Sequence, residues 1–302
     1  IESTLQHRDL LKGNPTVMYS HGEHTFPEYN NGLGYMNLIS IIFEIEILIQ
    51  EFKRTKNERP ADINFLFIEE PEAHTHPQMQ YIFINNIKEL LKEGIKRDDG
   101  NNRELQYIVS THSSHIVSES DFNDIRYLKK DGEYSVIAKG LKLLEAEYTE
   151  AGEEKNYRFL KQYLTLNKAE LFFADKAIMV EGDTERILLP SMMKKIDQEN
   201  EKNPLLSQNI SIVEVGAHSQ VFEKFINFIG LKKCLIVTDI DSYYEKVLFE
   251  DDGVTPKKYQ NNTVKKESIQ CATTNPNCSK TANNSLKFFH DGNSDINYFK
   301  DL

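Results

Sequence analysis

Apolar runs of strand length alternate along this 302-residue chain with segments whose apolar residues recur at helical spacing, and this alternation constrains the fold most. The apolar runs occupy 63–68, 106–110, 176–180, 210–215 and 234–238. The helical patterns occupy 38–52, 77–92, a stretch that ends near 167, a stretch through 193, and 219–228. Because strands that alternate with helices are typical of parallel sheets, the sequence predicts an α/β fold.

The length of the chain predicts two domains. We place the boundary just after the helix that ends near Asn167, which gives domains at 1–168 and 169–302. Within the first domain, a hairpin is expected over 126–138, and the charged stretch 145–155 carries little pattern.

The chain holds 36 Lys and Arg against 47 Asp and Glu, a formal net charge of −11. This balance excludes attraction of nucleic acid by the whole surface. Residues 169–302 contain 16 basic and 20 acidic residues, hence −4, which leaves 20 and 27, hence −7, for residues 1–168. Acidic side chains that bind metal ions have their charge offset locally, so DNA binding at a metal site stays compatible with this charge.

Three cysteines are too few for a disulfide framework, so a reducing cytoplasm is the expected location. Cys271 and Cys278 are interpreted as loop thiols, because two cysteines do not complete a zinc site. They lie in the polar stretch 246–285, which is interpreted as a flexible insertion or as a loop that contacts DNA or a partner. The longest apolar run, 39–49, is interrupted by two glutamates and too short to span a bilayer, so no membrane contact is expected.

Glu69 and Glu70 follow the first apolar run, and His112 follows the second. In open α/β sheets, ligands bind at the carboxyl ends of the strands. There one carboxylate can hold Mg²⁺ and its neighbour can deprotonate a water, while a histidine on an adjacent strand end can stabilise a γ-phosphate. For the two glutamates alone, an acidic strand end that faces water is the simpler interpretation.

The segments Phe-Leu-Phe-Ile-Glu-Glu-Pro at 65–71 and Ser-Thr-His-Ser at 110–113 together resemble the Walker B and switch-histidine segments of ABC-type ATPases of the SMC and RecF kind. The resemblance implies that Glu69 supports Mg²⁺, that Glu70 is the catalytic base, and that His112 is the switch residue.

The same resemblance places a signature-like loop at 30–35, where Asn31 and Gly32 would contact ATP across a dimer. No Gly-x-x-x-x-Gly-Lys-Ser/Thr loop, which would hold the phosphates, occurs in the chain. In this family that loop is N-terminal to the segments found here. The ATPase domain is therefore expected to be partial, and binding of ATP with Mg²⁺ is expected to need the upstream loop.

A second acidic group follows the third and fifth apolar runs, as Glu181-Gly-Asp-Thr-Glu185 and Asp239-Ile-Asp241. The two glutamates lie close together if a helix begins between them, and strand alternation sends the two aspartates to the same side. Carboxylates gathered at one sheet edge repel one another unless divalent cations are present, and such oxygen-rich sites suit Mg²⁺ or Mn²⁺. Two such ions can promote phosphodiester hydrolysis. Either motif alone also occurs by chance.

In this order and spacing the two motifs resemble a TOPRIM domain over about residues 170–245. An ABC-type ATPase head followed by TOPRIM is the architecture of the OLD (overcoming lysogenisation defect) family nucleases, to which the chain is similar. The resemblance implies a partial ABC-type ATPase lobe followed by a Rossmann-like TOPRIM domain with a parallel sheet, with truncation at the C-terminus left open.

The OLD resemblance further implies an ATPase-coupled DNA endonuclease with a two-metal Mg²⁺ or Mn²⁺ site. Glu181 would be a metal ligand or general base, Glu185, Asp239 and Asp241 would complete the site, and Asp183 is a weaker candidate. A homodimer or higher homo-oligomer, additional defence-system subunits and a role in bacterial antiphage defence follow by analogy.

Family members also place a basic residue after the second acidic motif. The candidates are Lys257, Lys258, Lys265 and Lys266. Two other functions stay open: a noncatalytic ATPase-type scaffold of a defence or DNA-repair complex, and a TOPRIM enzyme of the strand-passage or primase type. The four carboxylates argue against a pure scaffold, which has no need of them. Neither a further domain with a nucleophilic tyrosine, as in topoisomerases, nor the zinc module of primases is evident.

Overall fold

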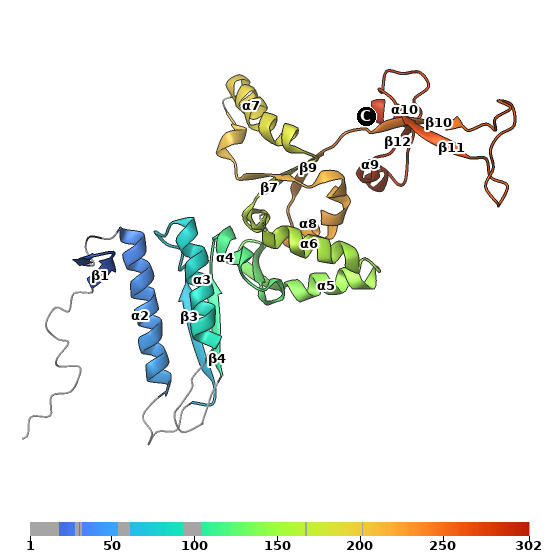
Figure 1. Ribbon diagram of the computed structural model, residues 1–302. Coiled ribbons are helices and arrows are strands. Elements are labelled where there is room, and N and C mark those ends of the chain that lie inside the picture. Colours follow the sequence, from blue (N-terminus) through green and yellow to red (C-terminus); the bar gives the residue numbers. More distant parts are fainter. Residues whose placement is uncertain are drawn as a thin grey trace, which may run out of the picture. The chain divides into compact units, whose positions relative to one another are not determined.

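The computed structural model describes residues 18–27, 30, 32–53, 61–92, 104–166, 168–200 and 202–301. The chain folds into two compact units, Ile1–Asp121 and Phe122–Leu302, and Figure 1 labels many of the elements of both. The mixed α/β class predicted from the sequence is confirmed, since both units contain parallel strands.

The first unit contains a short antiparallel hairpin and a two-stranded parallel sheet with helices. Its elements are β1 (Met18–His21), β2 (His24–Pro27), α2 (Leu33–Lys53), β3 (Asn64–Glu69), α3 (Pro77–Lys92), β4 (Leu105–Ser110) and α4 (Ser114–Ser118). β3 and β4 pair in parallel from Asn64 opposite Leu105 to Glu69 opposite Ser110. The strands expected at 63–68 and 106–110 and the helices expected at 38–52 and 77–92 are thus confirmed.

Alternation along β3 determines which of its residues enter the core of the first unit. Leu66 and Ile68 are buried, and they join Ile45 of α2 and Ile87 of α3 in one apolar cluster. Full burial of such a side chain contributes about 1.5–3 kcal/mol relative to exposure, so this cluster holds β3 against the two helices. Phe67 points the other way and is 70% exposed.

Helix α2 corrects one argument drawn from the sequence. The apolar run 39–49 is too short to span a bilayer, but the helix continues on both sides of it to 21 residues and contains an 18-residue window with a mean hydropathy of 1.5. By length and composition α2 could therefore cross a membrane. Core helices meet the same criteria, and Leu38, Ile45 and Ile49 of α2 are buried in the first unit. The absence of a membrane contact stays a prediction.

The second unit begins with a hairpin and two helices, followed by a three-stranded parallel sheet and a three-stranded antiparallel sheet. Its strands are β5 (Arg126–Asp131), β6 (Ser135–Gly140), β7 (Lys176–Val180), β8 (Ile210–Glu214), β9 (Lys233–Val237), β10 (Ser242–Val247), β11 (Lys266–Gln270) and β12 (Lys280–Thr281). Its α-helices are α5 (Leu141–Glu150), α6 (Glu154–Leu166), α7 (Asp183–Glu199), α8 (Glu223–Ile229), α9 (Asn284–Phe289) and α10 (Ile296–Lys300).

The parallel sheet has the order β8-β7-β9, with β7 in the centre. Val180, the last residue of β7, pairs with Glu214 on one side and Val237 on the other. The carboxyl ends of the three strands therefore lie at one edge, and the residues that follow them meet there.

Helix α5 occupies most of the charged stretch 145–155 that was expected to carry little pattern, so that expectation is wrong. Leu141, Leu144 and Tyr148 recur at helical spacing and are at most 1% exposed. Helices α5 and α6 contact each other, as Figure 1 shows, and α5 also contacts α8. These contacts explain why the compact unit begins at Phe122, whereas the domain boundary near residue 168 stays a prediction.

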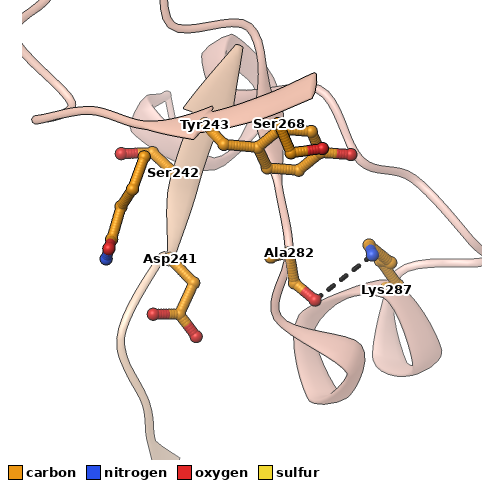
Figure 2. A pocket seen from close by; sticks show the side chains of 7 residues that line it. Asp241, Ser242, Tyr243, Ser268, Ala282 and Lys287 are labelled. Atoms are coloured by element: carbon orange, nitrogen blue, oxygen red, sulfur yellow. Dashed lines mark hydrogen bonds between the residues drawn. The ribbon is translucent and has the colours of Figure 1, made fainter. Parts of the chain in front are cut away.

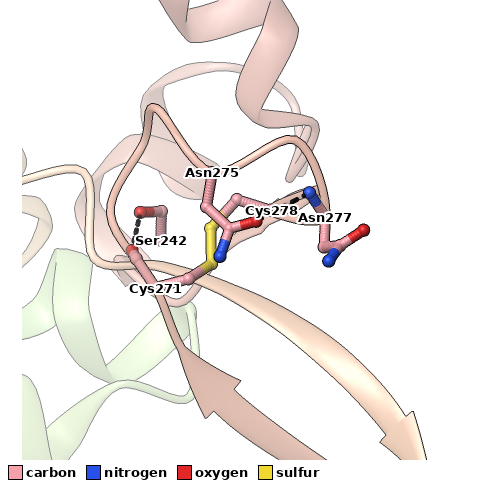
Figure 3. The surroundings of a disulfide bond; sticks show 5 residues. All are labelled: Ser242, Cys271, Asn275, Asn277 and Cys278. Carbon is pink, nitrogen blue, oxygen red and sulfur yellow. Dashed lines mark hydrogen bonds between the residues drawn. A yellow bond between two sulfur atoms is a disulfide. The ribbon is translucent and has the colours of Figure 1, made fainter.

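The polar stretch 246–285 is not simply a flexible insertion, because it forms much of the antiparallel sheet β11-β10-β12. Tyr243 to Val247 of β10 pair with Gln270 to Lys266 of β11. The interpretation of its cysteines as free thiols is also wrong. Cys271 and Cys278 form a disulfide across a loop that turns at Asn275, as Figure 3 shows, so three cysteines were enough for one bridge.

Candidate functional site

The first acidic group lies where β3 ends, in the first unit. Glu70 extends the strand pairing by one residue, since its amide donates to the Ser110 carbonyl at 3.0 Å. Its backbone then enters the left-handed region at a φ of 41°. A non-glycine residue there is strained, and such strain occurs preferentially at functional sites.

Glu70 and His112 are brought together from the two strand ends. Glu70 Oε1 lies 3.4 Å from His112 Nε2, and both side chains are largely exposed. The amide of His112 also donates to Glu72 Oε1 at 2.6 Å, so Glu72 fixes the backbone that carries the histidine. Glu69 is exposed at the end of β3 beside these residues. Parallel pairing thus gathers the predicted Walker B and switch residues.

The predicted signature-like loop is described only in part, because Asn31 lies outside the described residues. The carbonyl of Gly32 accepts from the amides of Tyr35 and Met36 at the start of α2. A Cβ on Gly34 would lie 2.5 Å from the carbonyl oxygen of His74. Glycine at position 34 therefore allows α2 to begin directly against the loop that follows Glu70.

The second acidic group lies at the carboxyl edge of β8-β7-β9. Glu181, directly after β7, accepts two hydrogen bonds on Oε2. The amide of Asp239 donates one at 2.9 Å, and the hydroxyl of Thr238 donates the other at 2.5 Å. The ends of β7 and β9 are therefore joined through the first predicted metal ligand.

Asn283 supports this pair from the residue before α9. Its Nδ2 donates to Thr238 Oγ1 at 2.7 Å and to the Asp239 carbonyl at 2.9 Å, while its Oδ1 accepts from the Leu286 amide at 3.0 Å. The side chain is buried, with 2% exposure, and all its hydrogen-bonding groups are engaged.

Asp241 lies two residues beyond Asp239, with a positive φ of 48°. Its carbonyl accepts from the amide of Ala282 at 2.8 Å. Burial, together with the negative charges of Glu181 and Asp239, raises the pKa of the Asp241 carboxyl. The three carboxylates are thus close enough to repel one another, which is the electrostatic condition that a cation relieves.

Glu185 and Asp183 have other contacts. Glu185 Oε2 accepts from the amide of Gly182 at 2.9 Å, which caps the start of α7. Asp183 lies 3.8 Å from Arg186 in an exposed ion pair. The structure therefore places Glu185 at the expected edge but turned toward its own helix.

The chemistry of this donor set fits Mg²⁺ or Mn²⁺, because Glu181, Asp239 and Asp241 offer only carboxylate oxygens. Within the described residues, no three His, Cys, Asp or Glu side chains are already arranged as a metal-binding group. The fit is thus one of charge and position at the strand ends. Full coordination would require rotation of these carboxylates.

Sequence reasoning missed three supporting residues: Glu72, Thr238 and Asn283. Thr238 was assigned to its strand but given no role, although it directly precedes the Asp-x-Asp motif. Asn283 gives no signal of its own, because only the antiparallel sheet returns it to β9. Two of the four candidate lysines have side-chain contacts of their own. Lys266 pairs with Glu245 at 2.9 Å, and Lys265 lies over the ring of Tyr259.

Two family models match the chain. Residues 2–117 match the AAA ATPase domain, and residues 172–241 match the "Overcoming lysogenization defect protein-like, TOPRIM domain". A solved SMC ATPase structure aligns with 49% of this chain and 78% of that chain, at 19% identity and a TM-score of 0.31.

Three curated proteins are similar in sequence. "Endonuclease GajA" of Bacillus cereus (strain HuB5-5) is 33% identical over 268 residues, which cover 84% of this chain and 38% of that protein. "Old nuclease" of Escherichia phage P2 is 29% identical over 64% of this chain and 30% of its own length. "OLD nuclease" of Thermus scotoductus is 25% identical over 68% of this chain and 34% of its own length. The chain thus spans about a third of the length of these relatives.

Proposed function

Since this chain carries the domain pair of the OLD (overcoming lysogenization defect) family, an AAA ATPase domain and an OLD-like TOPRIM domain, we propose that it is an ATPase-linked DNA endonuclease that requires a divalent cation. The observation that carries the proposal is the meeting of Glu181, Asp239 and Asp241 at one edge of a parallel sheet. The names of the three relatives, all nucleases, support the same function.

In this proposal Glu181, Asp239 and Asp241 hold Mg²⁺ or Mn²⁺, and Glu185 joins them when it turns away from Gly182. The bound cations would activate a water and offset charge on the phosphate. Both hydrogen bonds to Glu181 use Oε2, so Oε1 remains the oxygen with which Glu181 can hold a cation or accept a proton from water. Thr238 and Asn283 keep that carboxylate at the strand edge.

Cleavage of supercoiled plasmid in Mg²⁺ or Mn²⁺ tests the nuclease proposal. We expect Glu181→Gln and Asp239→Asn to reduce cleavage at least about a hundredfold, as loss of a transition-state contact does. Glu199→Gln is the matched control, because Glu199 is an exposed carboxylate at the end of α7. Equal cutting by Glu181→Gln and the wild type would refute the assignment, as would cutting that persists in EDTA.

For the ATPase domain we propose that Glu69 supports Mg²⁺, Glu70 acts as base and His112 responds to the γ-phosphate, with Asn31 and Gly32 of a second copy against the nucleotide. The contact of 3.4 Å between Glu70 and His112 supports this assignment. The test is ATP turnover by a chain that includes the upstream phosphate-binding loop. Glu70→Gln should lower it at least about tenfold, and unchanged turnover would contradict the assignment.

We further propose a homodimer or higher homo-oligomer that acts in the cytoplasm in bacterial antiphage defence, with or without additional subunits. Light scattering with ATP tests the oligomer. Phage plating on cells that produce the wild type or Glu181→Gln tests the defence role. Equal plating on both strains would argue against defence without affecting the nuclease assignment.

A further inference from the structure

A cavity of about 470 Å³ opens beside Asp241 in the second unit. Figure 2 shows it between β10, β11 and the start of α9. Its lining residues are Asp241, Ser242, Tyr243, Ser268, Gln270, Ala282 and Lys287. Pockets of about 300–1,000 Å³ typically hold one small ligand, so this cavity is large enough for one nucleotide.

One face of the antiparallel sheet supplies an aromatic ring with polar groups beside it. Tyr243 is paired directly with Gln270, and Ser268 is paired with Glu245, two residues further along β10. Because paired residues and those two apart share a face, Tyr243, Gln270 and Ser268 point to the same side. A ring for stacking next to an amide and a hydroxyl is the combination that binds a nucleobase.

Lys287 supplies the positive charge of the cavity. Its Nζ donates to the carbonyl of Ala282 at 3.2 Å, a contact drawn in Figure 2. In the described part of the chain no carboxylate forms an ion pair with it, whereas Lys266 and Lys280 are both paired with Glu245. The charge of Lys287 is therefore available to an anion such as a phosphate.

The cavity shares Asp241 with the proposed metal centre, and this determines which nucleotide reaches it. A DNA strand cut at that centre continues beyond the cut bond, so its next nucleotide must lie on the adjoining surface. This cavity is a concave surface that adjoins Asp241 and could receive that nucleotide.

We propose that the cavity is a subsite for one nucleotide of the DNA strand, next to the cleaved bond. Lys287 contacts its phosphate, Tyr243 stacks on its base, and Gln270 and Ser268 form hydrogen bonds with the base edge. The inference rests on the proposed nuclease function and adds to it the place where base preference next to the cut arises.

Fluorescence anisotropy of the full chain with a labelled single-stranded oligonucleotide, with Ca²⁺ in place of Mg²⁺, tests the subsite. We expect Lys287→Ala to weaken binding about tenfold and to reduce the slope of log affinity against log salt by about one. Tyr243→Ala should weaken binding about tenfold with no change in slope, while Tyr243→Phe, which keeps the ring, should bind like the wild type. Lys300→Ala on α10 is the charge-matched control, since Lys300 is exposed.

Binding by Lys287→Ala that equals binding by Lys300→Ala would overturn the subsite, provided circular dichroism shows that both are folded. If Tyr243→Ala does not fold, Gln270→Ala replaces it as the variant that removes a contact to the base. The comparison of Lys287→Ala with Lys300→Ala then decides the question together with it. A free mononucleotide that competes as strongly as the strand would also overturn it, because the site would then bind a metabolite. Plasmid cleavage by the wild type separates the two proposals. If Lys287→Ala binds as well as Lys300→Ala while the wild type still cuts plasmid, the subsite alone is refuted. If the wild type does not cut plasmid, the nuclease proposal itself is refuted.

Discussion

The side-chain amide of Asn283 donates a 2.9 Å hydrogen bond to the main-chain carbonyl of Asp239, 44 residues earlier in the chain. Its second hydrogen goes to Thr238, whose hydroxyl donates to Glu181. A single buried amide thus connects the start of α9 to two of the proposed metal ligands.

Asn283→Asp keeps the oxygen that caps α9 and removes the NH₂ donor. We expect cleavage to fall about tenfold to a hundredfold with little change in the Michaelis constant for DNA, because misplacement of reacting groups by about 1 Å costs rate rather than binding. Asn283→Ala also loses the cap and should lower the free energy of unfolding by about 1 kcal/mol. Wild-type cleavage by Asn283→Asp would show that the amide does not position the site.

Gly34→Ala should destabilise the first unit by about 1–3 kcal/mol, because the new methyl group would lie 2.5 Å from the carbonyl oxygen of His74. Gly32→Ala is the matched control, since a Cβ there meets nothing within 4 Å. Thermal unfolding of the two variants measures the difference. Equal melting temperatures would mean that α2 does not pack against this loop.

Lys224→Met should weaken the contact between α8 and the start of α6. Lys224 Nζ lies 2.8 Å from Glu153 Oε2, and its hydrogen bond lowers the pKa of Glu153 below the ordinary 4.5. A carboxyl with a lowered folded pKa stabilises the protein above its ordinary pKa, and this stabilisation is lost as the pH falls through the lowered value. At pH 7 we expect a loss of about 0.5 kcal/mol, since the pair is partly exposed.

The difference between Lys224→Met and the wild type should therefore shrink as the pH falls below 4.5, and urea unfolding over that range measures it. A remainder should persist, because Lys224 also lies 4.9 Å from the ring centre of Tyr148 and that contact does not require ionised Glu153. Lys142→Met, at an exposed position of α5, controls for loss of charge. A difference that is the same at every pH would contradict the ion-pair account.

Reduction of the Cys271–Cys278 disulfide should lower the free energy of unfolding by about 2–3 kcal/mol, the loop-closure value for a loop of this length. Cys271→Ser and Cys278→Ser should reproduce the loss, while a reductant should have no further effect on them. Peptide mapping without reductant tests the bridge directly. Cys234→Ser is the control, because Cys234 is the free cysteine of the described chain.

The sequence predicts well where local pattern and tertiary packing agree. The run at 176–180 is apolar and short, and it forms the central strand β7, so the position of Glu181 at a sheet edge follows from pattern alone. Helix α5 was missed because its charged residues outnumber the three that pack inward. The periodicity of Leu141, Leu144 and Tyr148 was nevertheless present.

The antiparallel sheet could not be predicted, because its strands are polar and are stabilised by pairing rather than by an apolar face. β10 pairs with β11 across the intervening residues 248–265, and it pairs with β12, which follows β11 after the disulfide loop. No local pattern encodes such pairings. For the same reason the sequence identified the carboxylates but not Asn283, whose place depends on that sheet.

The Asp239–Asp241 segment joins two sheets of opposite kind, since β9 of the parallel sheet ends at Val237 and β10 of the antiparallel sheet begins at Ser242. The near end of the β10–β11 ribbon is fixed by the mutual hydrogen bonds of Ser242 and Cys271, while its far end lies beyond Val247. Insertions or deletions at that far end leave the carboxylates in place. The outer ribbon can therefore change in length and sequence without altering the geometry of the proposed metal centre.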